Sequence, residues 1–251
     1  MGSALGPNVV TEGLILCWDP ANVKSYSGSG TSITDLAGNT TITQSSGTFS
    51  SSLESTGVFT SVLNSGYLGG TYQLAFSYSA SSDLASALSV TVGGWTIEEW
   101  VNVKGLAYPQ TKAGAVFSGS AYQSGAVGFD YNHGNTSSLR IGAGDGGSSS
   151  NGYEVDDTLS ETVALDTWWC RQIVYDRDLD EIRNYINGVH QDTTDTSAVT
   201  SSFYDGGGAS IGTLYGWFHY GERSLTKIYN KILSPTELQR NFNAIKGRFN
   251  L

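Results

Sequence analysis

The sequence predicts an all-β fold, a sandwich or a barrel, with one helix at its C-terminal end. Short apolar or alternating runs recur along the chain between clusters of Gly, Ser and Asn, a spacing typical of antiparallel sheet proteins. The composition agrees, because 32 of the 251 residues are Gly and 14 are Tyr. Charged residues make up only 14%, against roughly 25% in an average globular protein.

The strands are expected in the following order. The first, residues 13–20, ends at Pro20, and a stretch rich in turn residues follows it. Residues 95–103, WTIEEWVNV, predict the clearest strand. Residues 168–192 predict two long strands joined by the loop DRDLDE, and the second ends at Asn187-Gly188, a favoured tight-turn pair. Further strands are expected within residues 72–79, 113–120, 126–132 and 138–144.

One helix is expected at about residues 235–246. Ser234 is a good N-cap, Pro235 suits the first helical position, and Glu237 completes a capping box. The helix should pack through one apolar face formed by Leu238, Phe242 and Ile245, and it should end near Gly247. No linker interrupts the pattern, so we expect an N-terminal arm over residues 1–12 and a single domain over residues 13–251.

The charge balance and the cysteines exclude several classes of protein. The formal net charge is −10, and such a surface repels phosphate backbones, so nucleic-acid binding is not expected. No basic segment followed by an apolar run opens the chain, and no stretch approaches the roughly 20 apolar residues of a membrane span. Cys17 and Cys170 fall in apolar, strand-like runs, which favours two buried free thiols but leaves a disulfide open.

The stretch YEVDDTLSE, residues 153–161, looks most like catalytic chemistry. On a strand, Glu154 and Asp156 would share a face, as paired carboxylates do in glycoside hydrolases. The compact glucanase patterns are E-x-D-x-E and E-x-D-x-x-E, whereas the third acid here is Glu161, two residues too far along. We therefore interpret the stretch as a connection and a short strand whose acids are solvated.

No other catalytic pattern is found. Glu98 and Glu99 are adjacent on a predicted strand, so they point to opposite faces, and at least one of them should face solvent. The three histidines, His133, His190 and His219, are far apart, and no zinc, P-loop or Gly-x-Ser-x-Gly motif accompanies them. The sequence therefore predicts that the chain is not an enzyme.

Two kinds of ligand remain as candidates. Asp19, Asp35 and Asn39 could bring oxygen ligands for calcium together from neighbouring loops, as could DRDLDE, although isolated loop acids are usually solvated. No other cofactor is expected. A sugar site is predicted from exposed aromatic groups in two segments interpreted as loops, residues 129–135 and 215–222. Its candidate residues are Tyr131, His133, Trp217, His219 and Tyr220.

Three segments resemble one family. GGWTIEEWVNV is similar to a strand of laminin-G-like (concanavalin A-like) jelly rolls. DTWWCRQIVYDRDLDEIRNYINGV resembles the hairpin of that family, with Trp168, Tyr175, Tyr185, Asn187 and Gly188 at matching positions, and SLTKIYNKILSPTELQRNFNAIKGRF resembles its closing strand and helix. The resemblance implies a two-sheet antiparallel jelly-roll sandwich, and it fixes the fold far better than the role.

The opening and the ending of the chain are also similar to stand-alone jelly rolls of tailed-phage virions, cyanophages in particular. That resemblance implies a capsid decoration protein on the virion, assembled in the host cytoplasm. Its expected partners are the major capsid protein or another virion protein and further copies of itself, with the arm as part of the contact. The main alternative is a carbohydrate-binding module of a tail or fibre that recognises a host glycan, and a laminarinase-like hydrolase ranks last.

Overall fold

The computed structural model describes the helices, most strands and several connections. The described residues are 8–38, 41–46, 48–49, 58–60, 62–64, 71–73, 75–78, 93–104, 115–116, 126–133, 138–144, 155–162, 164–197, 209–211, 213–214, 217–218 and 221–251. Within these residues the strands form two eight-stranded sheets in which every pair is antiparallel. The predicted two-sheet antiparallel fold is therefore confirmed.

The first sheet has the order β16-β15-β14-β9-β20-β5-β4, and β1 also pairs with β20. Its strands are β1 (Leu14–Trp18), β4 (Thr48–Phe49), β5 (Phe59–Thr60), β9 (Gly94–Val103), β14 (Trp168–Asp176), β15 (Glu181–Ile186), β16 (Val189–Asp195) and β20 (Gly221–Tyr229). The expected strands at 13–20 and 95–103 and the long hairpin beginning at residue 168 all lie in this sheet.

The second sheet has the order β13-β12-β11-β10-β17-β8-β3-β2. Its strands are β2 (Ser32–Thr34), β3 (Thr41–Ser46), β8 (Ala75–Tyr78), β10 (Ala115–Val116), β11 (Ala126–His133), β12 (Ser138–Gly144), β13 (Val155–Thr162) and β17 (Ala209–Ile211). Two further ribbons pair β6 (Val62–Asn64) with β7 (Thr71–Gln73) and β18 (Thr213–Leu214) with β19 (Trp217–Phe218).

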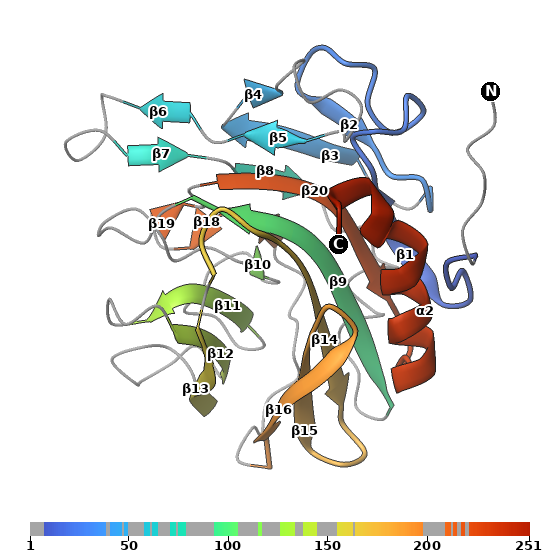
Figure 1. The fold of residues 1–251 in the computed structure, drawn as a ribbon, viewed down its shortest axis with the longest axis vertical. Coiled ribbons are helices and arrows are strands. Elements are labelled where there is room, and N and C mark those ends of the chain that lie inside the picture. The colour runs from blue at the N-terminus through green and yellow to red at the C-terminus, as the bar shows by residue number, and fades with distance from the viewer. Residues whose placement is uncertain are drawn as a thin grey trace.

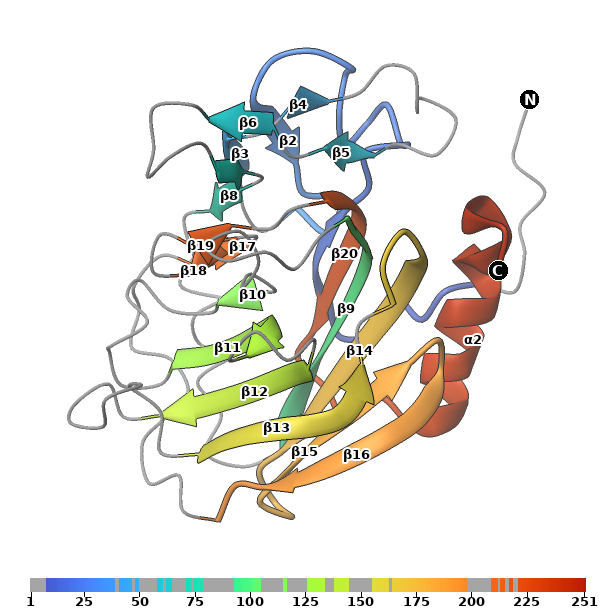
Figure 2. The same cartoon turned by 60° about the vertical axis from the view of Figure 1, so that its left-hand side comes forward.

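The helix and the two sheets lie in three layers. Helix α2 (Pro235–Ile245), followed by the 3₁₀ helix η2 (Lys246–Phe249), covers one face of the first sheet, and the second sheet lies on the opposite side (Figures 1 and 2). The strands at the centre of the first sheet are therefore covered on both faces. All ten residues of β9 are buried, as is usual for a strand between two layers.

The predicted helix start is confirmed in detail. The Ser234 hydroxyl accepts a hydrogen bond from the Glu237 backbone N–H, and the Glu237 carboxylate accepts one from the Ser234 backbone N–H, which completes the capping box. Pro235 occupies the first turn, where its missing N–H costs nothing. Leu238 and Phe242 are buried against the sheet, and Ile245 packs beside them.

Residues 126–133 form β11, which confirms the strand expected within residues 126–132. Tyr131 and His133 therefore lie on a strand and not in the loop expected for residues 129–135. The stretch at residues 153–161, interpreted as a connection and a short strand, contributes most of the eight-residue strand β13. β13 is the last strand in the order of the second sheet, and an edge strand tolerates the polar residues that interrupt an apolar alternation. The boundary between the arm and the domain at residues 12 and 13 stays a prediction.

Candidate functional site

One end of the second sheet brings together the backbone positions of three of the predicted sugar residues, Tyr131, His133 and Trp217. β11 and β17 both pair antiparallel with β10, so they run in the same direction on either side of it. Val116 of β10 pairs with Gly128 of β11 on one side and with Ser210 of β17 on the other, so these three residues lie side by side across the sheet. Beyond this level β11 continues to Tyr131 and His133, and the chain after β17 continues into the β18–β19 ribbon beside β10 (Figure 2).

Trp217 reaches the same end of the sheet through this ribbon. It pairs with Leu214, three residues past Ile211, while Tyr131 lies three residues past Gly128. Neighbouring strands are about 4.8 Å apart and each residue advances about 3.3 Å, so these backbone positions lie within on the order of 10–15 Å of each other. His219 and Tyr220, the remaining predicted sugar residues, lie outside the described residues.

The two described residues of the predicted calcium set have structural partners. The Asp35 Oδ1 accepts hydrogen bonds from the backbone N–H groups of Cys17, at 2.8 Å, and Ala37, at 2.9 Å. The Asp19 Oδ1 lies 2.8 Å from Nη1 of Arg248. These contacts close the segment after β1 and hold η2 beside it. Asn39 lies outside the described residues, and calcium binding stays a prediction.

Neither a cluster of metal-ligating side chains nor a membrane-spanning helix is found in the described part of the chain. No group of three or more His, Cys, Asp or Glu residues is arranged there to hold a metal ion. Among the helices of that part, none is both long and apolar enough to cross a bilayer.

The adjacent carboxylates of β9 are both buried, so the expectation that one faces solvent was wrong. Glu98 lies under α2, where its Oε1 is 2.8 Å from Nζ of Lys227 and its Oε2 accepts a hydrogen bond from the Gln172 amide. Glu99 points to the opposite face and forms an ion pair with Arg223. The reason is that both faces of β9 are covered, one by α2 and one by the second sheet.

The two cysteines are buried free thiols, which confirms the favoured interpretation. β14, β9, β20 and β1 are consecutive neighbours, with Cys170 on the first and Cys17 on the last. Three strand spacings of about 4.8 Å separate them by about 14 Å, twice the Cα separation that a disulfide spans. Burial raises the pKa of Cys17 to about 12 and that of Cys170 well above its ordinary value, although Lys227 opposes both shifts.

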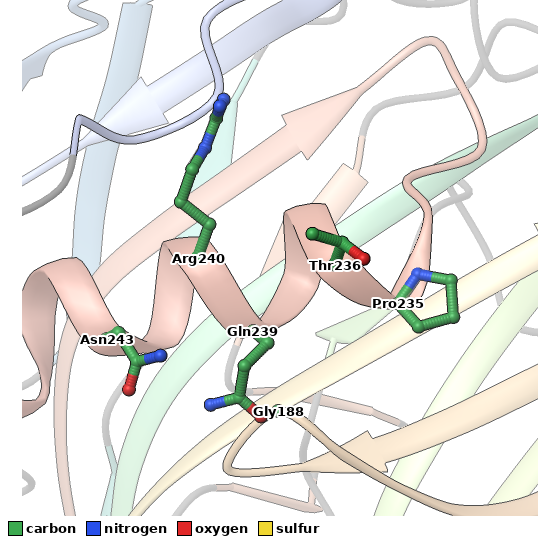
Figure 3. A pocket seen from close by; sticks show the side chains of 6 residues that line it. All are labelled: Gly188, Pro235, Thr236, Gln239, Arg240 and Asn243. Carbon is green, nitrogen blue, oxygen red and sulfur yellow. The ribbon is translucent and has the colours of Figure 1, made fainter.

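A depression on the outer surface of α2 was not anticipated from the sequence. It lies between the helix and the turn that joins β15 to β16, and it is lined by Gly188, Pro235, Thr236, Gln239, Arg240 and Asn243 (Figure 3). Gln239 reaches down to Gly188, whereas Arg240 extends away from the turn. The turn and the helix were each predicted, but only tertiary packing brings them together. No aromatic group lines the depression, so it lacks a platform for a sugar ring.

Solved structures share this arrangement of two sheets. Domain 4 of AbnA, an extracellular arabinanase from Geobacillus stearothermophilus solved with arabinotriose, has 17% identity and a TM-score of 0.57, covering 92% of this chain and 98% of that domain. The binding domain of botulinum neurotoxin DC, in complex with rat synaptotagmin II, has 11% identity and a TM-score of 0.59 over 93% of this chain and 52% of the other. Trypanosoma rangeli sialidase, in complex with sialic acid, has 12% identity and a TM-score of 0.65 over 98% of this chain and 36% of the other.

The likeness to these structures shows that the fold is a two-sheet β-sandwich. A sequence model of the concanavalin A-like lectin/glucanases superfamily matches residues 75–239, well over half of the chain, and the chain belongs to that superfamily. No curated protein matches it in sequence. The chain spans about half of the neurotoxin binding domain and about a third of the sialidase, so these likenesses concern the fold.

Proposed function

We propose that this chain is a non-enzymatic carbohydrate-binding module of the lectin type. The observation that carries the proposal is the convergence of β11 and the β18–β19 ribbon at one end of the second sheet. It gathers the positions of Tyr131, His133 and Trp217, and aromatic groups beside polar ones are what ligand sites offer to a sugar ring. Membership of the superfamily supports the same class of function, as does the likeness to a domain solved with arabinotriose.

The charges beside this site favour a neutral glycan. Strands β11, β12 and β13 carry one basic residue, Arg140, which pairs in register with Asp130. The edge strand β13 adds Asp156, Asp157 and Glu161 without a further basic residue on these three strands. An excess of acidic residues on these strands, in a chain of net charge −10, disfavours carboxylated or sulfated sugars. We therefore expect binding of neutral polysaccharides.

The carboxylates of β9 support a role without catalysis. Glycoside hydrolysis needs two carboxyl groups about 5–9 Å apart on the two sides of a bound sugar. Glu98 and Glu99 are buried on opposite faces of the strand, and each is held in an ion pair. Neither carboxylate is presented to a substrate.

Binding to immobilised polysaccharides tests the proposal. The intact chain should be retained by at least one neutral polysaccharide from a panel of arabinan, β-glucan and dextran. It should not be retained by polygalacturonate or heparin. Trp217→Ala and Tyr131→Ala should each weaken retention by about tenfold, the effect of losing an important contact residue. Val23→Ala, at an 82% exposed loop position, is the matched control.

The urea midpoint of each variant shows whether it still folds. Loss of retention with an unchanged midpoint supports a direct contact with the glycan. If neither neutral nor anionic polysaccharides are retained by the intact chain, the lectin proposal is wrong. If only the anionic ones are retained, the module binds sugars but the proposed ligand class is wrong.

A second proposal places the module on a phage particle, as a capsid decoration protein. It is supported by the similarity of residues 6–39 and 241–249 to stand-alone jelly rolls of tailed-phage virions. It is compatible with sugar binding, because a decoration protein can also adhere to a glycan. Quantifying this chain against the major capsid subunit in purified particles tests it. Copies in proportion to the capsid subunit, on heads freed of tails, support decoration, whereas loss with the tails indicates a fibre and absence overturns the placement.

A further inference from the structure

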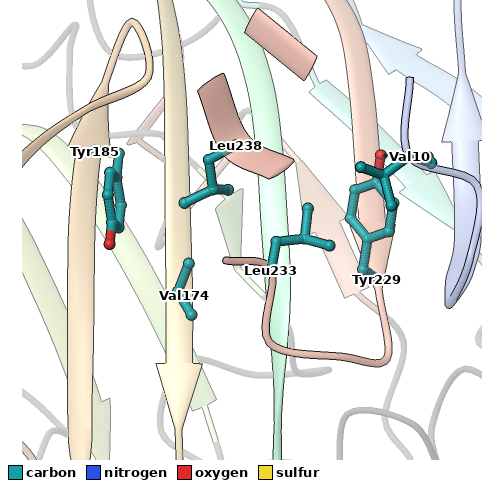
Figure 4. Close-up of a cluster of buried hydrophobic side chains, with 6 residues drawn as sticks. All are labelled: Val10, Val174, Tyr185, Tyr229, Leu233 and Leu238. Atoms are coloured by element: carbon teal, nitrogen blue, oxygen red, sulfur yellow. Dashed lines mark hydrogen bonds between the residues drawn. The ribbon is translucent and has the colours of Figure 1, made fainter. Parts of the chain in front are cut away.

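Residues 8–12, which we call the strap, lie against the end of the chain. Val10 is 2% exposed and belongs to a buried cluster with Val174, Tyr185, Tyr229, Leu233 and Leu238 (Figure 4). These partners come from β14, β15, β20, the segment before α2, and α2 itself. The strap therefore fills part of the space between α2 and the first sheet.

Three buried hydrogen bonds connect the strap, α2 and β20 in a closed ring. The Val10 N–H donates to Oδ1 of Asn241 on α2 at 2.8 Å, and the Tyr229 hydroxyl donates to the Val10 carbonyl at 3.1 Å. The Asn241 amide also donates to the Tyr229 hydroxyl, at 3.0 Å. Removing the strap would leave the Asn241 and Tyr229 groups without these partners, and buried polar groups that lose their partners are costly. The strap thus provides hydrogen-bond partners for a side chain of α2 and for a side chain of β20.

The strap joins β1 at Gly13, whose backbone packs closely against Asn230 and Lys231. Gly13 has a φ of +74°, and a Cβ there would lie 2.9 Å from both the Asn230 Oδ1 and the Lys231 Cγ. Its carbonyl accepts a hydrogen bond from the Asn230 N–H at 2.8 Å. Next to Gly13 in the strap, Glu12 forms an ion pair with Lys231, which also pairs with Glu237. The Glu12 side chain is 86% exposed, so its ion pair contributes little to stability. Val10 therefore provides the main attachment.

Helix α2 itself is attached without any strand pairing. Side-chain hydrogen bonds link this segment to the sheet. The Gln172 amide donates to the Leu238 carbonyl and the Leu233 N–H donates to the Thr96 hydroxyl. The Asn241 amide donates to the Tyr229 hydroxyl, and Arg248 of η2 donates to the Ser224 hydroxyl. The ion pair between Arg248 and Asp19 and apolar packing complete the attachment. That packing includes a cluster of Cys17, Trp100, Cys170, Leu225, Phe242 and Phe249, to which α2 and η2 contribute Phe242 and Phe249. β9 is also joined to a paired strand on each side, and an element that lacks such pairing opens at lower free energy than the sheet on which it lies.

We propose that the strap is a releasable clamp: its detachment at Gly13 frees α2 and η2 as one unit, while the two-sheet sandwich stays folded. The opened form exposes the apolar face of the first sheet together with the two thiols. The strap is then the element of the fold that controls access to this face. This inference does not depend on the proposed sugar site.

Hydrogen exchange of the intact wild-type chain across low urea concentrations tests the proposal first. Amides of α2 should exchange through an opening with a weak urea dependence, because it exposes little surface, and amides of β9 and β14 only through the strongly dependent global unfolding. Labelling of the thiols by a disulfide reagent should follow the α2 opening. An equal urea dependence for α2 and β9 would show one cooperative unit and overturn the proposal.

Val10→Ala tests the role of the strap directly. Deleting its buried methyl groups should raise the α2 exchange rate and the thiol labelling rate by about tenfold or more, while β9 and β14 keep most of their protection. Val10→Thr, which keeps the side-chain volume but places a hydroxyl in the apolar cluster, is a second variant in case the first does not fold. Val23→Ala is the matched exposed control. If Val10→Ala changes α2 no more than Val23→Ala does, the strap is not the clamp.

Discussion

Lys227 lies directly opposite Glu98 across the β20–β9 pair, with its Nζ 2.8 Å from the Glu98 Oε1 and both side chains buried. Gln172, opposite Glu98 on the other neighbouring strand, donates to Oε2 of the same carboxylate and to the Leu238 carbonyl on α2. One row of side chains across β14, β9 and β20 thus forms a hydrogen-bonded network that ends on the helix. Such a network specifies how α2 sits, because each member needs the others.

Removing the charge of Lys227 alone should lower the free energy of unfolding far more than removing the charges of Lys227 and Glu98 together. Lys227→Met leaves the Glu98 carboxylate buried without its cation, which should cost about 3–5 kcal/mol of unfolding free energy. Adding Glu98→Gln removes that charge and keeps an oxygen for the Gln172 amide, so the double variant should be more stable than Lys227→Met alone. Urea unfolding of the wild type, both single variants and the double variant gives the coupling energy. Strictly additive effects would show that the two side chains do not stabilise each other.

The buried thiols should make stability fall at high pH. Burial raises the pKa of Cys17 to about 12 and that of Cys170 well above its ordinary value, whereas both are about 8.5 in an unfolded chain. The folded state therefore keeps its thiol protons when the unfolded state has lost them. The free energy of unfolding is therefore unaffected by ionisation of the thiols below about pH 8.5. Above that pH it falls by about 1.4 kcal/mol per pH unit for each thiol, as the pH rises toward 12.

The double variant Cys17→Ala/Cys170→Ala isolates this contribution. Tyrosines ionise in both chains, so their effect cancels in the comparison. Urea unfolding at pH 7.5, 9 and 10.5 should give a steeper loss of stability for the wild type than for the double variant. Parallel slopes would contradict the raised thiol pKa values.

The fold could be predicted because its signals are local. Short contiguous stretches of sequence predict three of its features, namely strand β9, the hairpin of β14 and β15, and the capping box of α2. The burial of Glu98 could not be predicted, because the helix that covers it lies more than 130 residues away in sequence. The role of Val10 was missed for the same reason, since its partners Tyr229 and Asn241 belong to the other end of the chain.

The candidate sugar site was predicted only as a set of aromatic residues. Tyr131 and Trp217 are 86 positions apart in sequence. β10 pairs with β11 and contacts β18, the partner of β19, and so brings the two positions to one end of the sheet. Strand order is a global property that one sequence does not display. The sequence therefore indicated which residues suit a glycan, and the topology indicated which of them lie together.

Loss of the helix cap should weaken α2 by a known amount. Ser234→Ala removes the hydroxyl that accepts the Glu237 N–H, and losing such a cap typically costs about 1 kcal/mol. The stabilisation from the Glu237 side of the cap should also be lost at acid pH. The Ser234 N–H, followed by Lys231, lowers the pKa of Glu237, so its stabilisation is present above the ordinary glutamate pKa and is lost as the pH falls through the lowered value.

Urea unfolding at pH 7 measures this cost, with Ser29→Ala at an exposed loop position as the matched control. Hydrogen exchange should locate the change in the first turn of α2. If the two serine variants have the same stability, the capping hydrogen bonds contribute nothing measurable in solution.

Gly94 should be the least replaceable glycine among those that the structure describes. A Cβ at this position would lie 1.9 Å from the Tyr175 carbonyl oxygen and 2.9 Å from Cγ1 of Ile232. Because Gly94 pairs in register with Asp176, the clash falls on the backbone where β9 and β14 meet, and backbone cannot move aside without breaking the pair. Gly94→Ala should therefore cost more than about 4 kcal/mol, in the exceptional range for one substitution.

Gly247→Ala is the matched comparison. No atom lies within 4 Å of a Cβ built there, and its φ is not positive, so the change should stay within about 0.5 kcal/mol of the wild type. Soluble yield and urea midpoint of the two variants give the contrast. A Gly94→Ala chain as stable as Gly247→Ala would mean that β9 and β14 pair only from Trp95 onward. The clash at the Tyr175 carbonyl would then be relieved by a shift of the chain before the strand.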